Sequence, residues 1–105
     1  MYAKLGQPEL ALNYFLQALA ISRQVGDREG EGSIFHCMGL LYFEQKEYHP
    51  ALTYLLLARK LFEEIQVPDL KNVLSCIDTL RKEIGEEQFA ILLDQTEPVS
   101  FQFVA

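Results

Sequence analysis

Apolar side chains recur every three or four residues through most of the sequence, which is the period of an amphipathic helix. The first such stretch predicts a helix over residues 8–25, with Pro8 in its first turn and Gly26 at its end. Asp27 is then placed to cap a second helix that runs to about Lys46. We therefore expect the first part of the chain to form two helices joined by a tight corner.

The same spacing predicts two further helices. The third begins at Pro50 and ends near Gln66, where residues 67–69 interrupt the pattern with a proline. The fourth ends at Gly85, and its apolar residues follow a single helical stripe. The members of this stripe are Leu70, Val73, Leu74, Ile77, Leu80 and Ile84. Each helix has an apolar side and is expected to pack against a neighbour.

The C-terminal part of the sequence is predicted to change from helix to extended chain. Residues 86–94 continue with a short helix. Residues 95–105 contain a proline and then alternating apolar side chains, at Val99, Phe101 and Phe103, which is the pattern of an extended segment. This tail is expected to pack on the last helix, to be disordered, or to occupy a groove of its own or a neighbouring chain.

An internal repeat of 40 residues relates the first half of the sequence to the second. Comparing residues 2–18 with residues 42–58 gives six identities. These are Tyr2/Tyr42, Ala11/Ala51, Leu12/Leu52, Tyr14/Tyr54, Leu16/Leu56 and Ala18/Ala58. A fixed period with matching apolar positions indicates stacked helical units.

The repeated residues follow a known consensus. Those that carry it are Phe35, Met38, Gly39, Tyr42, Ala51, Leu55 and Ala58, with Ala11 and Phe15 in the preceding unit. They resemble the tetratricopeptide repeat, whose pattern places an aromatic residue, Leu-Gly, Tyr, and then Ala-x3-Phe and Ala at these spacings. The period of 40 in place of 34 is similar to the long-helix variant of that family. The resemblance covers residues 2–66 and fades after residue 68.

The resemblance implies an all-α fold, a right-handed superhelix of antiparallel helix pairs. It divides the chain into a partial unit 1–26, a full unit 27–67 and a degenerate capping unit 68–94, followed by the extended tail. Because the sequence begins at the counterpart of Tyr42, we expect it to be a fragment of a longer array.

In this family the first helix of each unit lines a concave groove that binds peptides or partner helices. By position in the motif, the groove residues are Ser33, His36, Leu40, Phe43, Glu44, Val73, Cys76, Leu80 and Glu83. Three of these, Leu40, Phe43 and Leu80, have an alternative role, which is to bury against a neighbouring unit. The Lys and Asn that clamp a peptide carboxylate in one subtype are replaced by His36 and Leu40, so recognition of chaperone tails is not expected.

The charge balance narrows the classes of partner. The chain has 15 acidic residues against 9 Lys and Arg, a net charge of −6. It contains no run of basic residues to neutralise phosphates, so nucleic acid and anionic membrane are excluded as expected partners. A neutral or basic protein or peptide fits better. With no secretory signal recognised and Cys37 and Cys76 in apolar helical stretches, we expect free thiols and a cytoplasmic location.

Candidate chemistry is sparse. His36 and Cys76 occupy the same place in successive units and are expected to face each other, but a structural zinc site needs four protein ligands. No phosphate loop, nucleophile elbow or zinc-protease motif occurs, so neither enzyme activity, a metal nor a cofactor is expected. The predicted function is a non-catalytic interaction scaffold. The alternatives are a peptide-sensing regulatory module of a larger protein, and a structural repeat that self-assembles through its end faces or residues 98–104.

Overall fold

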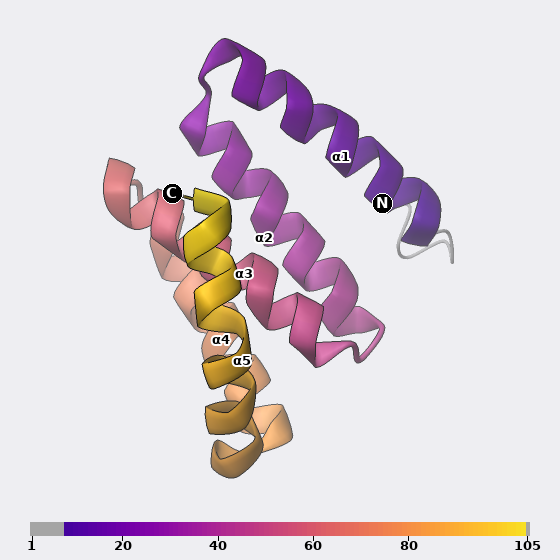
Figure 1. Ribbon diagram of the computed structural model, residues 1–105, viewed down its shortest axis with the longest axis vertical. Helices are drawn as coiled ribbons and strands as arrows, with labels where there is room; N and C mark the ends of the chain where they lie inside the picture. Colours follow the sequence, from indigo (N-terminus) through magenta and orange to yellow (C-terminus); the bar gives the residue numbers. More distant parts are fainter. Residues whose placement is uncertain (1–7, 105) are drawn as a thin grey trace.

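The computed structural model describes the backbone of residues 8–104 and the side chains of residues 9–96. This part of the chain forms five helices and no strand, which confirms the all-α prediction. They are α1 (Pro8–Val25), α2 (Arg28–Glu44), α3 (Tyr48–Ile65), α4 (Leu70–Ile84) and α5 (Glu86–Val104). Figure 1 shows α1, α2 and α3 as consecutive antiparallel hairpins, with α4 and α5 following on the far side of α3.

The helix ends follow local chemistry that the sequence already indicated. Asp27 caps α2 by accepting the backbone N–H of Gly30 on its Oδ1, with an N···O distance of 2.9 Å. Gly26 and Gly85 lie at the corners after α1 and α4 with φ of 75° and 90°, where a side chain would be strained. Helices α1 and α4 have the predicted bounds, and α3 begins at Tyr48, two residues before the predicted start.

The core lies mainly between α2 and α3. Gly39 lets the two backbones approach closely, because a Cβ at this position would lie 2.8 Å from Cγ of Leu55. Tyr54 of α3 stacks on two aromatic rings of α2, with centroid distances of 5.9 Å to Phe35 and 5.7 Å to Tyr42. The motif residues therefore pack as the repeat consensus implies.

Helix α4 lies on α3 in the way that α2 lies on α1. The buried side chains of α4 are Val73, Ile77 and Leu80. Thirty-nine residues earlier, the same positions hold Ile34, Met38 and Leu41, which are all buried or half-buried in α2. Leu41 lines a cleft together with Leu12 of α1. The stacking of one unit on the next is thus repeated, with an offset of 39 residues rather than 40.

The second packing surface of α2 is not repeated in α4. On α2 this surface includes Phe35, Gly39 and Tyr42, which contact α3. Their counterparts at an offset of 39 are Leu74, Asp78 and Arg81. Leu74 is 45% exposed, whereas Phe35 is 1% exposed. Because charged side chains replace the apolar surface, α5 packs more closely on α3 than on α4.

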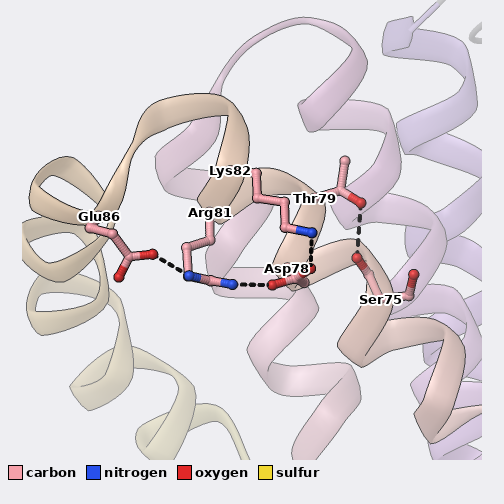
Figure 2. A network of polar contacts seen from close by, with 6 residues as sticks. All are labelled: Ser75, Asp78, Thr79, Arg81, Lys82 and Glu86. Atoms are coloured by element: carbon pink, nitrogen blue, oxygen red, sulfur yellow. Dashed lines mark hydrogen bonds and ion pairs between the residues drawn. The ribbon is translucent and has the colours of Figure 1, made fainter.

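A polar network covers the side of α4 that carries Asp78 and Arg81 (Figure 2). The Arg81 guanidinium donates to the carboxylates of Asp78 and Glu86, and so links α4 to the first turn of α5. Lys82 Nζ lies 3.1 Å from Asp78 Oδ2. The hydrogen bond from Arg81, followed by that from Lys82, lowers the pKa of the Asp78 carboxyl. The network stays at the surface, where ion pairs contribute little to stability.

The predicted extended tail is wrong for residues 95–104, because α5 continues to Val104. Its residues that face the core are Phe89, Leu92, Leu93 and Thr96. This spacing of three and four residues continues past residue 94 and favours a longer helix packed on α3, which outweighs the alternating pattern. The side chains of residues 98–104, expected to take part in self-association, lie outside the described residues. The division into units at residues 26, 67 and 94 stays a prediction.

Candidate peptide-binding face

One side of α2 carries side chains that the core does not use. They are Ser33, Cys37, Leu40 and Glu44, at positions i, i+4, i+7 and i+11. This spacing places them along a single line on the helix. The first three are half-buried and Glu44 is exposed. Leu40 is the central apolar side chain of this line, and it is not among the residues packed on the core.

The contact between His36 and Cys76 brings α4 alongside α2. His36 Nε2 lies 3.3 Å from Cys76 Sγ, and both side chains are half-buried. Burial lowers the pKa of His36, and the charge of Asp69 partly opposes this change. Burial also raises the pKa of the Cys76 thiol. The pair is therefore a neutral imidazole against a neutral thiol, which confirms the predicted meeting of these two side chains.

Two predicted groove residues do not face a groove. Val73 and Leu80 are fully buried, so the prediction is wrong for them. The reason is the offset of 39 residues, which turns each of them inward by one helical position, about 100°. Asn72 and Thr79 take their places on the surface and are both exposed. The matching line on α4 is Asn72, Cys76, Thr79 and Glu83. Cys76 is half-buried and packed against the core, and the other three are exposed.

Three residues of this face were missed by the sequence prediction. Cys37, Asn72 and Thr79 lie on the two lines, although the motif comparison did not select them. The spacing of Ser33 and Leu40 around Cys37 is the signal that identifies it, because i−4 and i+3 neighbours share a helix face. We call the two lines together the α2–α4 face: Ser33, Cys37, Leu40 and Glu44 with Asn72, Cys76, Thr79 and Glu83.

Phe43 has a structural role at the edge of this face. It packs on the core, and its ring meets Tyr48 edge to face with a centroid distance of 6.0 Å. Phe43 therefore packs within its own predicted unit, and its roles in a groove or against a neighbouring unit stay predictions. The Tyr48 hydroxyl in turn donates to Glu83, and this hydrogen bond raises the pKa of Tyr48.

The two carboxylates of the α2–α4 face, Glu44 and Glu83, differ in their surroundings. Glu83 Oε2 lies 3.8 Å from Lys46 Nζ in addition to its bond from Tyr48. Glu44, the last residue of the α2 line, is exposed. The electrostatic preference of the face therefore depends more on Glu44 than on Glu83.

Two clefts lie outside the α2–α4 face. The larger has a volume of about 450 Å³ and separates α5 from the ends of α3 and α4. Its lining residues are Tyr48, His49, Ile84, Gln88, Ile91, Leu92 and Gln95. The smaller, about 230 Å³, lies between the first turns of α1 and the end of α2.

The described side chains hold no group of three or more His, Cys, Asp or Glu placed to bind one metal ion. Likewise, none of the helices in residues 8–104 combines the length and apolar character needed to cross a membrane.

The fold and the motif residues together place the chain in a class of helical repeat proteins. A family model described as tetratricopeptide repeat matches residues 1–64. The chain belongs to the tetratricopeptide repeat family. No curated protein and no solved structure matches it. Repeats of this family generally mediate protein–protein interactions and are typically non-catalytic.

Proposed function

We propose that this chain binds a peptide or a helix of a partner protein on the α2–α4 face. The observation that supports this most directly is the 3.3 Å contact between His36 and Cys76. It sets the exposed lines of two successive units side by side, so that a ligand lying across them meets side chains from both helices. A continuous surface of this kind suits an extended or helical segment.

The chemistry of the face selects a particular type of ligand. Leu40 and the thiols of Cys37 and Cys76 form its apolar part, and polar side chains surround them. The exposed carboxylate of Glu44 favours a neutral or basic segment over an acidic one. A ligand with an apolar anchor next to a Lys or Arg fits this arrangement. We include a cytoplasmic, reducing location in the proposal because Cys37 and Cys76 are both free.

The first experiment compares partners captured by the wild type, Leu40→Glu and Leu74→Glu. Leu74 is 45% exposed, whereas Leu40 is half-buried, and Leu74 lies nearly opposite Cys76 on α4, so Leu74→Glu adds the same charge away from the face. Circular dichroism and thermal melting establish first that all three chains fold alike. Partners lost with Leu40→Glu and kept with Leu74→Glu support the proposal. Equal losses, or no losses, contradict it.

A further inference from the structure

The larger cleft, between α5 and the ends of α3 and α4, combines apolar and amide side chains. We call it the α3–α5 cleft. Its wall on α5 is a single line, Gln88, Ile91 and Gln95, at positions i, i+3 and i+7. Ile84 of α4 adds to the apolar surface, and Ile91 is 49% exposed. The volume of about 450 Å³ lies within the range of about 300–1,000 Å³ that ligand pockets have.

Carboxylates lie beside this cleft rather than inside it. None of the described residues that line it is an Asp, Glu, Lys or Arg. Glu87 and Asp94 stand at i−4 and i+3 from Ile91, so they flank Ile91 on the side of α5 that faces away from the core. Both are exposed, and neither forms an ion pair with another described side chain. The edge of the cleft along α5 is therefore negatively charged.

The opposite wall adds little to this charge. The hydroxyl of Tyr48, which lines the cleft, donates to the carboxylate of Glu83. Lys46 Nζ lies 3.8 Å from Glu83 Oε2 and opposes its charge. The negative charge that is left for a ligand to meet is thus mainly that of Glu87 and Asp94.

An arginine side chain matches this combination of surfaces. Its carbon stem is apolar, and its guanidinium is always charged and less strongly hydrated than an ammonium group. A stem that lies over Ile91 covers exposed apolar surface while the guanidinium reaches Glu87 or Asp94. The amide oxygens of Gln88 and Gln95 can accept further N–H groups. We propose that the α3–α5 cleft binds an arginine within an otherwise apolar segment of a partner protein. This inference does not depend on binding at the α2–α4 face.

The contact is expected to be weak and sensitive to salt. Exposed ion pairs contribute little to affinity, and charges at the rim of an interface act mainly on the association rate and its salt dependence. The apolar part of the contact is not screened. Binding should therefore weaken, without being lost, between about 0.01 M and about 1 M salt, where the Debye length falls from about 30 Å to about 3 Å.

An NMR titration of the full chain tests the proposal. The probes are a blocked peptide of sequence Gly-Leu-Arg-Leu-Gly and the same peptide with Gln in place of Arg. The Arg peptide is expected to shift the backbone amide signals of Gln88, Ile91 and Gln95. The Gln peptide is expected to bind at least about threefold more weakly, because it lacks the charge that the carboxylates attract.

A pair of charge variants tests the part played by the carboxylates. Glu87→Gln combined with Asp94→Asn should abolish the preference for the Arg peptide. The matched control is Glu29→Gln combined with Glu63→Gln, which should keep the preference. Both double variants change the net charge equally, and each removes one acidic residue from the first turn of a helix. All four positions are exposed, so both variants should fold, which circular dichroism checks.

A second pair of variants tests the apolar contact. Ile91→Ala should weaken the binding of both peptides, whereas Leu16→Ala should weaken neither. Leu16 is 48% exposed on α1 and is therefore matched to Ile91 in exposure. An Arg peptide that shifts no signal, or shifts signals on the α2–α4 face alone, overturns the inference. Equal binding of the Arg and Gln peptides, or an equal preference in the two charge variants, also overturns it.

Discussion

His36 and Cys76 stand 40 residues apart in the sequence and 3.3 Å apart in the fold, measured from Nε2 to Sγ. This contact connects the first helices of two successive units. It depends on close packing rather than on charge, because burial keeps the imidazole and the thiol in their neutral forms. The exposed lines on either side of the contact form the proposed binding face.

The burial of His36 predicts a pH dependence of stability. Its pKa is lower in the folded chain than in the unfolded chain. Above the unfolded-state pKa of about 6.5, His36 is neutral in both the folded and the unfolded chain. There its burial does not change the free energy of unfolding with pH. As the pH falls below that value, the unfolded chain takes up the proton first, so the free energy of unfolding decreases. Urea unfolding at about pH 7.5 and about pH 5.5 should show a smaller decrease for His36→Gln than for the wild type. Equal decreases for His36→Gln and the wild type would contradict this role of His36.

The cap of α2 is predicted to contribute to stability through one hydrogen bond. Asp27→Ala removes the acceptor of the Gly30 N–H and should cost about 1 kcal/mol, whereas Asp27→Asn should cost less. Glu47→Ala is a matched control, because Glu47 stands at the same place before α3 without a side-chain cap bond. Chemical denaturation measures all three. Equal costs for Asp27→Ala and Glu47→Ala would show that the cap bond does not matter.

The close approach of α2 and α3 at Gly39 is predicted to outweigh the higher helix propensity of alanine. At an exposed position inside a helix, Gly→Ala stabilises the fold by about 1 kcal/mol. Here the added methyl group would lie 2.8 Å from Leu55 Cγ, and such overpacking costs about 1–3 kcal/mol. Gly39→Ala should therefore destabilise the chain, and less so when combined with Leu55→Val. A double-mutant cycle measures this coupling. Additive effects would contradict the contact.

Truncating the side chain at the same repeat position is predicted to lower stability much more in α2 than in α4. Phe35→Ala should cost about 3–5 kcal/mol, because the ring is buried between α2 and α3. Leu74→Ala at the counterpart position should stay within about 0.5 kcal/mol, because α5 does not cover it. Thermal and chemical unfolding of both variants check this pair. A large cost for Leu74→Ala would show that α4 and α5 pack as a regular repeat.

Much of the fold was predictable because its determinants are local. Gly26, Asp27 and Gly85 set the helix ends, and the 40-residue identities identified the repeat. On α2, Ser33, His36 and Leu40 are half-buried, and their role in lining a groove stays a prediction. Motif comparison works well here because the motif residues themselves form the core.

The errors arose where packing between distant elements decides the structure. Val73 and Leu80 were assigned by an offset of 40, but the contact of α4 with α3 follows an offset of 39. The last helix was predicted too short because the alternating apolar residues after Pro98 outweighed, in the prediction, the helical spacing of Phe89, Leu92, Leu93 and Thr96. Both errors fall after residue 68, where the motif fades and only tertiary contacts position the helices.

Site-specific photo-crosslinking tests the central claim most directly. A photoreactive phenylalanine analogue is placed at residue 40, at residue 79 or, as a control, at residue 74, and the adducts formed in native extract are identified by mass spectrometry. The proposed function predicts the same partner at residues 40 and 79 and its absence at residue 74. A partner that cross-links at residue 74 but at neither residue 40 nor residue 79 would contradict binding on the α2–α4 face.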